Sequence, residues 1–171
     1  MDLSASWDYV EAVTKSRLAN NKTSRHVADY GTYIETIGTA GELAVRRFLK
    51  MPETLHKHFD GGADLLWNNR RVDVKATILT PRIRFRYLQW RVGKHVKADI
   101  IMLTAVNIER RQAILVGWAT PDEILRAPVN DKRDYACHEI PTCSLHGAHE
   151  LLQPRAESFE GIRQQDYAIS A

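Results

Sequence analysis

Three charged residues within residues 62–77 are spaced so that their side chains meet on one face of a β-hairpin. The predicted turn is Asn68–Asn69, because asparagine tolerates the positive φ that tight hairpin turns require. With this turn, Asp64 faces Asp73 across the two strands, and Lys75 projects from the same face as Asp73. Opposed carboxylates about 5 Å apart repel each other, so the pairing is destabilising without a cation nearby. The hairpin therefore predicts a divalent-metal site beside a charged substrate.

These three side chains match what the hydrolysis of a phosphodiester requires. A Mg²⁺ ion takes oxygen ligands and retains several waters, so one or two carboxylates and the substrate oxygens are enough to hold it. The ion lowers the pKa of a bound water and stabilises the charged transition state. A lysine beside it contacts the attacking water and the scissile phosphate. We therefore assign Asp64 and Asp73 as metal ligands and Lys75 as the orienting cation; the competing interpretation is a surface salt-bridge cluster without chemistry.

Two helices are predicted before the hairpin. Residues 6–20 carry an apolar stripe at helical spacing, and residues 39–50 form a second helix with its own apolar face. Thr39 and Glu42 fit a capping box at the start of the second helix, in which the glutamate bonds back to the cap amide. Residues 25–37 are ambiguous, because a glycine interrupts their helical spacing.

The segment that follows the hairpin is strongly basic. Residues 81–92 alternate as a strand, with Tyr87 on the apolar face and Leu88 on the basic face. The basic segment, residues 82–97, holds four arginines and two lysines and no acidic residue: Arg82, Arg84, Arg86, Arg91, Lys94 and Lys97. This charge excess indicates a polyanionic partner, bound through phosphates without sequence specificity. The competing interpretation is an exposed edge strand whose arginines discourage pairing.

Further strands and helices complete the pattern of a sheet flanked by helices. Residues 99–106 are almost continuously apolar, which is typical of a central strand covered on both faces. The remaining expected elements are a strand at 113–118, a helix that begins with Pro121, a short strand at 137–140, a short helix at 144–152 and a polar tail after Pro154. The order of elements predicts an α/β fold.

The composition fits one globular domain over residues 1–171. The chain is 44% hydrophobic and 26% charged, and no apolar run is long enough to span a membrane. The first residues do not form a signal peptide, and two cysteines do not make a disulfide framework, so we expect a cytoplasmic protein. The spacing of Cys137, His138, Cys143, His146 and His149 matches no standard zinc finger, and we expect ordinary packing and surface positions there.

The motif Asp64, eight residues, Asp73-Val74-Lys75 resembles that of the PD-(D/E)xK nuclease superfamily. Glu42 stands where that superfamily places a glutamate on the helix before the hairpin, so the resemblance implies a metal-binding and catalytic role for it beside the capping role. The implied fold is restriction-endonuclease-like, with a central mixed sheet of about five strands flanked by helices. The resemblance covers a core of roughly residues 38–125, with an N-terminal helical extension and a C-terminal tail.

Together these observations predict a Mg²⁺- or Mn²⁺-dependent deoxyribonuclease, an endonuclease of restriction, resolvase or repair type. The catalytic set is Asp64, Asp73, Lys75 and Glu42, and the basic segment binds DNA. Many nucleases of this fold act as dimers because a duplex has two strands, so a homodimer is compatible with the resemblance. The alternative is a non-catalytic nucleic-acid-binding or assembly module that keeps the nuclease fold.

Overall fold

The computed structural model describes residues 1–20, 29–55, 63–80, 86–132 and 135–153 of the 171-residue chain. Three α-helices are present in these residues: α1 Trp7–Asn20, α2 Asp29–Phe48 and α3 Pro121–Arg126. The strands are β1 Leu65–Trp67, β2 Arg70–Ile78, β3 Tyr87–Arg91, β4 Ile100–Asn107, β5 Gln112–Ala119, β6 Val129–Asn130 and β7 Cys137–Pro141. Short 3₁₀ helices lie at Ser4–Ser6, Thr142–Ser144 and Ala148–Leu152.

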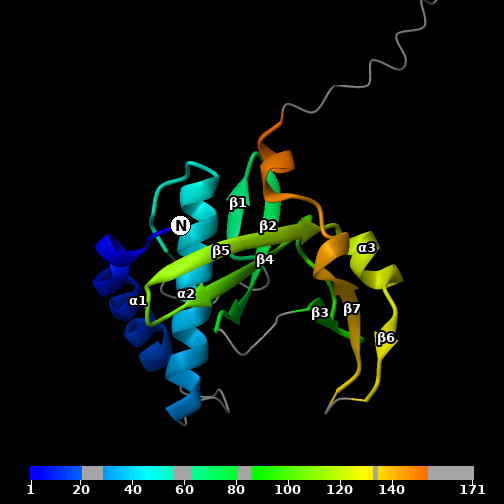
Figure 1. Ribbon diagram of the computed structural model, residues 1–171, viewed down its shortest axis with the longest axis horizontal. Helices are drawn as coiled ribbons and strands as arrows, with labels where there is room; N and C mark the ends of the chain where they lie inside the picture. Colours follow the sequence, from blue (N-terminus) through cyan, green and yellow to red (C-terminus); the bar gives the residue numbers. More distant parts are fainter. Residues whose placement is uncertain (21–28, 56–62, 81–85, 133–134, 154–171) are drawn as a thin grey trace, which may run out of the picture.

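The strands form two sheets (Figure 1). The larger is a mixed four-stranded sheet in the order β1-β2-β4-β5, in which β2 and β4 are parallel and the other neighbours are antiparallel. The smaller is an antiparallel three-stranded sheet in the order β3-β7-β6. The predicted α/β class and mixed sheet are confirmed, but the larger sheet has four strands rather than about five, because β3 pairs with β7 and not with the hairpin.

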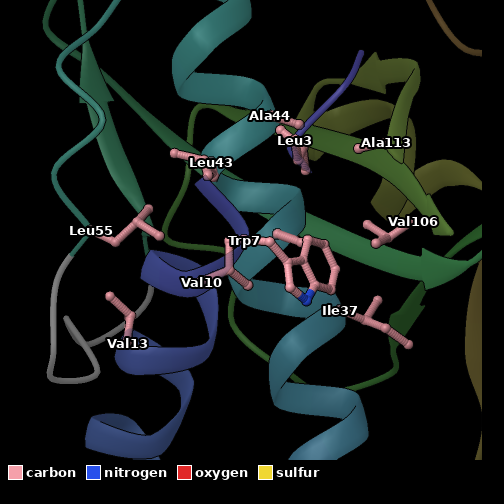
Figure 2. Packing of buried hydrophobic residues seen from close by; sticks show 11 residues of the cluster. Leu3, Trp7, Val10, Val13, Ile37, Leu43, Ala44, Leu55, Val106 and Ala113 are labelled. Atoms are coloured by element: carbon pink, nitrogen blue, oxygen red, sulfur yellow. The ribbon is translucent and has the colours of Figure 1, made fainter. Parts of the chain in front are cut away.

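Each face of the larger sheet buries its own set of apolar side chains. Helices α1 and α2 cover one face, where the Trp7 indole points toward Ile37 of α2 and Val106 of β4 (Figure 2). The opposite face carries Ile101 and Leu103 and packs against the smaller sheet and α3. Strand β4 is therefore covered on both sides, and its residues from Ile100 to Val106 are all buried, as the apolar run predicts.

Helix α2 differs from the prediction. A capping box that starts a helix at Thr39 is wrong, because Asp29–Phe48 is one continuous helix and Thr39 lies buried in its second half. Sequence reasoning set its start too late, since Gly31 interrupts the helical spacing of residues 25–37. Gly41 has a packing role instead: a Cβ there would lie 2.5 Å from Thr104 Oγ1 and 2.9 Å from Ala76 Cβ. The glycine allows the helix to approach β2 and β4 closely.

The hairpin forms as predicted. Leu65 pairs with Val72 and Trp67 with Arg70, while Asn68 and Asn69 have φ values of 48° and 60°. These are the left-handed conformations that a tight primed turn requires. The hairpin thus places the acidic residues of its two strands at the end away from the turn.

The predicted phase of strand β3 is wrong. Leu88 and Trp90 are buried, whereas Tyr87 is 40% exposed, so Leu88 rather than Tyr87 faces the core. The regular strand begins only at Tyr87, where pairing with β7 starts. The pairing with β7, rather than an alternation counted from residue 81, determines which side chains face the core. The part of the predicted strand at residues 81–85 lies outside the described residues.

Strand β5 lies at the edge of the larger sheet and is paired at both of its ends. The Met1 amino group donates to the Ala113 carbonyl at 2.8 Å, and the Ala113 N–H donates to the Met1 carbonyl at 3.0 Å. At the other end, Trp118 and His146 exchange two backbone hydrogen bonds of 3.0 and 2.9 Å. Segments from opposite ends of the described chain therefore flank one strand.

The other predicted elements are confirmed with small shifts in their ends. Strand β5, helix α3 with its Thr120–Glu123 capping box, and strand β7 lie where the sequence places them. The predicted helix at 144–152 is a 3₁₀ helix at Ala148–Leu152, and the tail after residue 153 lies outside the described residues. None of the helices in the described ranges is long and apolar enough to cross a membrane.

The close approach at Gly41 gives a direct test of the packing of α2. We expect Gly41→Ala to destabilise the protein by about 1–3 kcal/mol, because its Cβ meets two side chains of the sheet. Gly38→Ala is the matched control on the same helix, since no atom lies within 4 Å of its added Cβ. That change is expected to be neutral or to stabilise by up to about 1 kcal/mol. Urea unfolding of both variants measures the difference; equal effects contradict the packing.

Candidate active site

The hairpin brings Asp73 and Lys75 together on one face of β2. The Lys75 Nζ forms an ion pair with Asp73 Oδ1, while Val72 and Val74 point the other way into the core beneath α2. Asp73 is only 5% exposed. The predicted shared face of Asp73 and Lys75 is therefore present, and it is partly buried rather than solvated.

Asp64 lies one residue before β1 and is held against the same strand. Its backbone N–H donates to the Val72 carbonyl at 2.9 Å, and its Oδ2 accepts from the Val74 N–H at 2.5 Å. The regular strand pairing stops at Leu65, so Asp64 reaches β2 through these bonds rather than through a further ladder pair. The structure places Asp64 close enough to Asp73 for the charge of Asp73 to act on it.

The electrostatic surroundings of Asp64 disfavour its ionised form. Burial raises the pKa of Asp64 to about 7, and the negative charges of Glu42 and Asp73 add to the rise. The Val74 N–H and the Lys75 ammonium act in the opposite direction and are outweighed. Negative charge is thus in excess at this position, which is the condition that a bound cation relieves.

Glu42 of α2 is bound by an arginine from α1. Arg17 Nη1 donates to Glu42 Oε1 at 2.7 Å and Arg17 Nη2 donates to Oε2 at 2.6 Å, so the pair is bidentate. Both side chains are less than a tenth exposed. Burial acts to lower the pKa of Arg17, but the hydrogen bonds and charge of Glu42 outweigh it and raise the pKa above its ordinary value.

Arg17 is a site residue that sequence reasoning missed. It is buried with Trp7, Val10, Val13 and Thr14 on the inner face of α1. The signal that could have found it is this position, because a charged residue on a buried stripe requires a partner of opposite charge. The capping interpretation of Glu42 is wrong for the same reason, since its carboxylate contacts Arg17 from the interior of α2.

The carboxylate oxygens differ in what remains open to a metal ion. Asp64 Oδ2 accepts from Val74 and Asp73 Oδ1 contacts Lys75, and no donor among the described residues contacts the other oxygen of either side chain. Both Glu42 oxygens are bound by Arg17. Within the described ranges, no group of three or more His, Cys, Asp or Glu side chains could hold a metal ion. Two open carboxylate oxygens still suit Mg²⁺, which retains several waters.

Trp90 of the smaller sheet joins Lys75 to the basic segment. The Lys75 Nζ lies 4.8 Å and the Lys94 Nζ 5.1 Å from the centroid of the Trp90 ring, within the range of cation–π attraction. The indole N–H donates to the Lys94 carbonyl at 2.9 Å. The buried indole thus holds two ammonium groups near the acidic residues, although β3 and the hairpin belong to different sheets.

Four of the six predicted DNA-binding residues can be placed. Arg86, Arg91, Lys94 and Lys97 are exposed, on β3 or close to its ends. Arg91 lies 5.4 Å from the centroid of the Tyr135 ring. Arg82 and Arg84 lie outside the described residues.

The cysteine and histidine residues of the C-terminal part serve packing and surface contacts. Cys137 is buried and Cys143 exposed, and neither forms a disulfide within the described residues. His146 stacks on Trp118 with the ring centroids 4.4 Å apart, and its Nε2 lies 2.7 Å from Glu123 Oε1. These contacts attach the segment after β7 to β5 and α3.

Comparison of the chain with protein-family models, with curated proteins and with solved structures gives no match. The residues and the geometry of the site are therefore the basis for assigning a function.

The raised pKa of Asp64 predicts a pH-dependent stability without metal. The folded state disfavours the ionised carboxyl of Asp64. The free energy of unfolding therefore decreases as the pH rises from 3.8 to about 7. Asp64→Asn cannot ionise, so at pH 8 in EDTA we expect its melting temperature to exceed that of the wild type by about a few degrees. The difference should vanish toward pH 4.

Asp99→Asn is the matched control, because hydrogen bonds from Arg71 lower the pKa of this exposed carboxyl. Its removal should leave the stability at pH 8 unchanged or slightly reduced. An Asp64→Asn variant that melts below the wild type at pH 8 contradicts the assigned charge environment.

Proposed function

We propose that this protein is a Mg²⁺- or Mn²⁺-dependent nuclease that hydrolyses phosphodiester bonds in DNA. The observation that carries the proposal is the meeting of Asp64, Asp73 and Lys75 at the open end of the hairpin. One oxygen of each aspartate lacks a donor in the described part of the chain. A lysine next to such a pair is what a metal-assisted attack on a phosphate requires.

Each residue has a defined part in the proposed reaction. Asp64 and Asp73 hold the divalent ion, which activates a water and stabilises charge on the phosphate when bound. Lys75 donates hydrogen bonds to the attacking water and to a phosphate oxygen. Its contacts with Asp73 and with the Trp90 ring fix the position of the ammonium before the substrate arrives. Preorganised charge of this kind lowers the barrier without a reorganisation cost.

The arrangement of elements supports a restriction-endonuclease-like fold. Helix α2 precedes the hairpin β1–β2, β4 runs parallel to β2, and β5 returns antiparallel at the edge. The smaller sheet is then an addition that packs on the face of the larger sheet that carries Ile101 and Leu103. The order and pairing of the elements are the support for this fold, and the fold is therefore proposed together with the function.

DNA is the proposed substrate because cations surround the acidic residues. Lys75 and Lys94 both lie within cation–π distance of the Trp90 ring, at 4.8 and 5.1 Å from its centroid, so the indole is common to the acidic site and the basic segment. The exposed Arg86, Arg91 and Lys97 can contact neighbouring phosphates of the same strand. These contacts give affinity for a polyanion rather than recognition of a base sequence.

A second candidate is a nucleic-acid-binding module without catalysis. It is favoured by one observation: in the described part of the chain, no three acidic, histidine or cysteine side chains together could hold a metal ion. In this alternative, Lys75 serves only to neutralise Asp73. Metal binding and cleavage distinguish the two candidates.

Loss of the central charges tests the catalytic proposal. We expect Asp73→Asn and Lys75→Met each to reduce Mg²⁺-dependent cleavage of plasmid and branched DNA by about 10³-fold or more. Lys15→Met, which removes an exposed lysine from α1, is the matched control and should cleave as the wild type does. Circular dichroism melting establishes that each variant is folded. Cleavage that survives both site changes rules out this assignment.

The salt dependence of binding tests the role of the basic segment. Each phosphate contact contributes about one unit to the slope of log affinity against log salt concentration. The double change Arg86→Gln and Lys97→Gln should therefore reduce the slope by about two in EDTA, measured by fluorescence anisotropy with duplex DNA. Arg110→Gln in the turn before β5 is the control and should leave the slope unchanged. An unaltered slope in the double variant places DNA elsewhere on the protein.

A further inference from the structure

The buried pair of Arg17 and Glu42 has a consequence for how many metal ions the site can hold. Both oxygens of the Glu42 carboxylate are within 2.7 Å of guanidinium nitrogens of Arg17. A bidentate pair of this kind uses one lone pair of each oxygen and places a full positive charge on the carboxylate. Arg17 therefore neutralises the charge of Glu42 and makes its carboxylate a much weaker metal ligand than an unpaired one.

Arg17 is held in this position by more than Glu42. Its Nη1 also lies 3.3 Å from Glu35 Oε1 and 3.5 Å from Thr39 Oγ1, and both of these residues belong to α2. Arg17 is also buried on the inner face of α1 with Val10, Val13 and Thr14, which fixes the start of its side chain. Moving it would leave Glu42 as an uncompensated charge in a site less than a tenth exposed, which is strongly destabilising.

The acidic residues of the hairpin are in a different situation. Asp64 and Asp73 each use one oxygen within the described part of the chain and direct the other to no donor there. A single hard cation with retained waters needs no more than these two ligands. A second cation would need a third carboxylate, and Arg17 has already neutralised the nearest one.

We propose that Arg17 limits the site to one divalent cation, held by Asp64 and Asp73, by keeping Glu42 bound as its counter-ion. The guanidinium supplies the positive charge that balances Glu42, in place of a second ion. This inference rests on the proposed function, because it concerns the metal of the same site. Arg17 is a positioning residue here, since it acts through Glu42.

The test is the number of Mn²⁺ ions bound by the full chain at pH 7.5, measured by isothermal titration calorimetry and by electron paramagnetic resonance. The wild type should bind one Mn²⁺ without coupling between ions. Arg17→Met removes both hydrogen bonds and the counter-ion of Glu42, and should raise the count to two. The charge-balanced double change Arg17→Met with Glu42→Gln should restore a count of one, with a dissociation constant within about threefold of the wild type.

Arg47→Met is the matched control. It removes an ion pair between Arg47 of α2, the helix that carries Glu42, and Glu53, and should leave the count at one. Two coupled Mn²⁺ ions in the wild type overturn the inference, and so does a loss of affinity of about tenfold or more in the double variant, which would make Glu42 a ligand. A count of one in folded Arg17→Met also overturns it. If that variant does not fold, the wild type and the double variant decide. A wild type that binds no Mn²⁺ overturns the proposed function as well, whereas two ions overturn only this inference.

Discussion

The distance between α2 and the larger sheet is the constraint on which the site depends. Gly41 lies so close to Thr104 and Ala76 that no side chain fits between helix and sheet at this point. The next residue of the helix is Glu42, so its position follows from the depth at which α2 packs. Helix α1 lies against α2 and carries Arg17 to the same carboxylate. The absence of a Cβ at Gly41 thus allows the close packing that brings Arg17 of α1 and Glu42 of α2 toward the hairpin.

Desolvation is the main energetic term around these residues. A buried ion pair is stabilising only when its geometry and hydrogen bonds repay the loss of hydration, and the two-pronged contact of Arg17 with Glu42 meets that condition. Within the described residues, no arginine or lysine forms an ion pair with Asp64. Burial therefore raises the pKa of its carboxyl. The three carboxylates of one region therefore have three distinct surroundings: a guanidinium for Glu42, an ammonium for Asp73 and a backbone amide for Asp64. These surroundings indicate which carboxylates can still accept a cation.

Local signals in the sequence predicted the hairpin well, and long-range packing explains most of what they missed. Asn68 and Asn69 define both the turn and the register, so the face shared by Asp73 and Lys75 follows from counting residues. The apolar run of β4 likewise identified the central strand. The start of α2 was set too late, because Gly31 interrupts the helical spacing of residues that nevertheless belong to the helix. Arg17 and Trp90 reach the site from other elements, and no spacing in the sequence relates them to the hairpin.

The pairing of residues 1–3 with β5 affects the order in which the protein is completed on the ribosome. Met1 and Ala113 are 112 positions apart, so residues 1–3 are synthesised well before the strand with which they pair. At about 5–20 residues per second, the delay is about 6–20 s. In the part of this interval before residues 72–106 are made, the helices α1 and α2 can associate, but the strands that cover their apolar sides are absent. A nascent chain of this protein thus exposes an amphipathic helical pair for seconds, which is the kind of surface that chaperones bind.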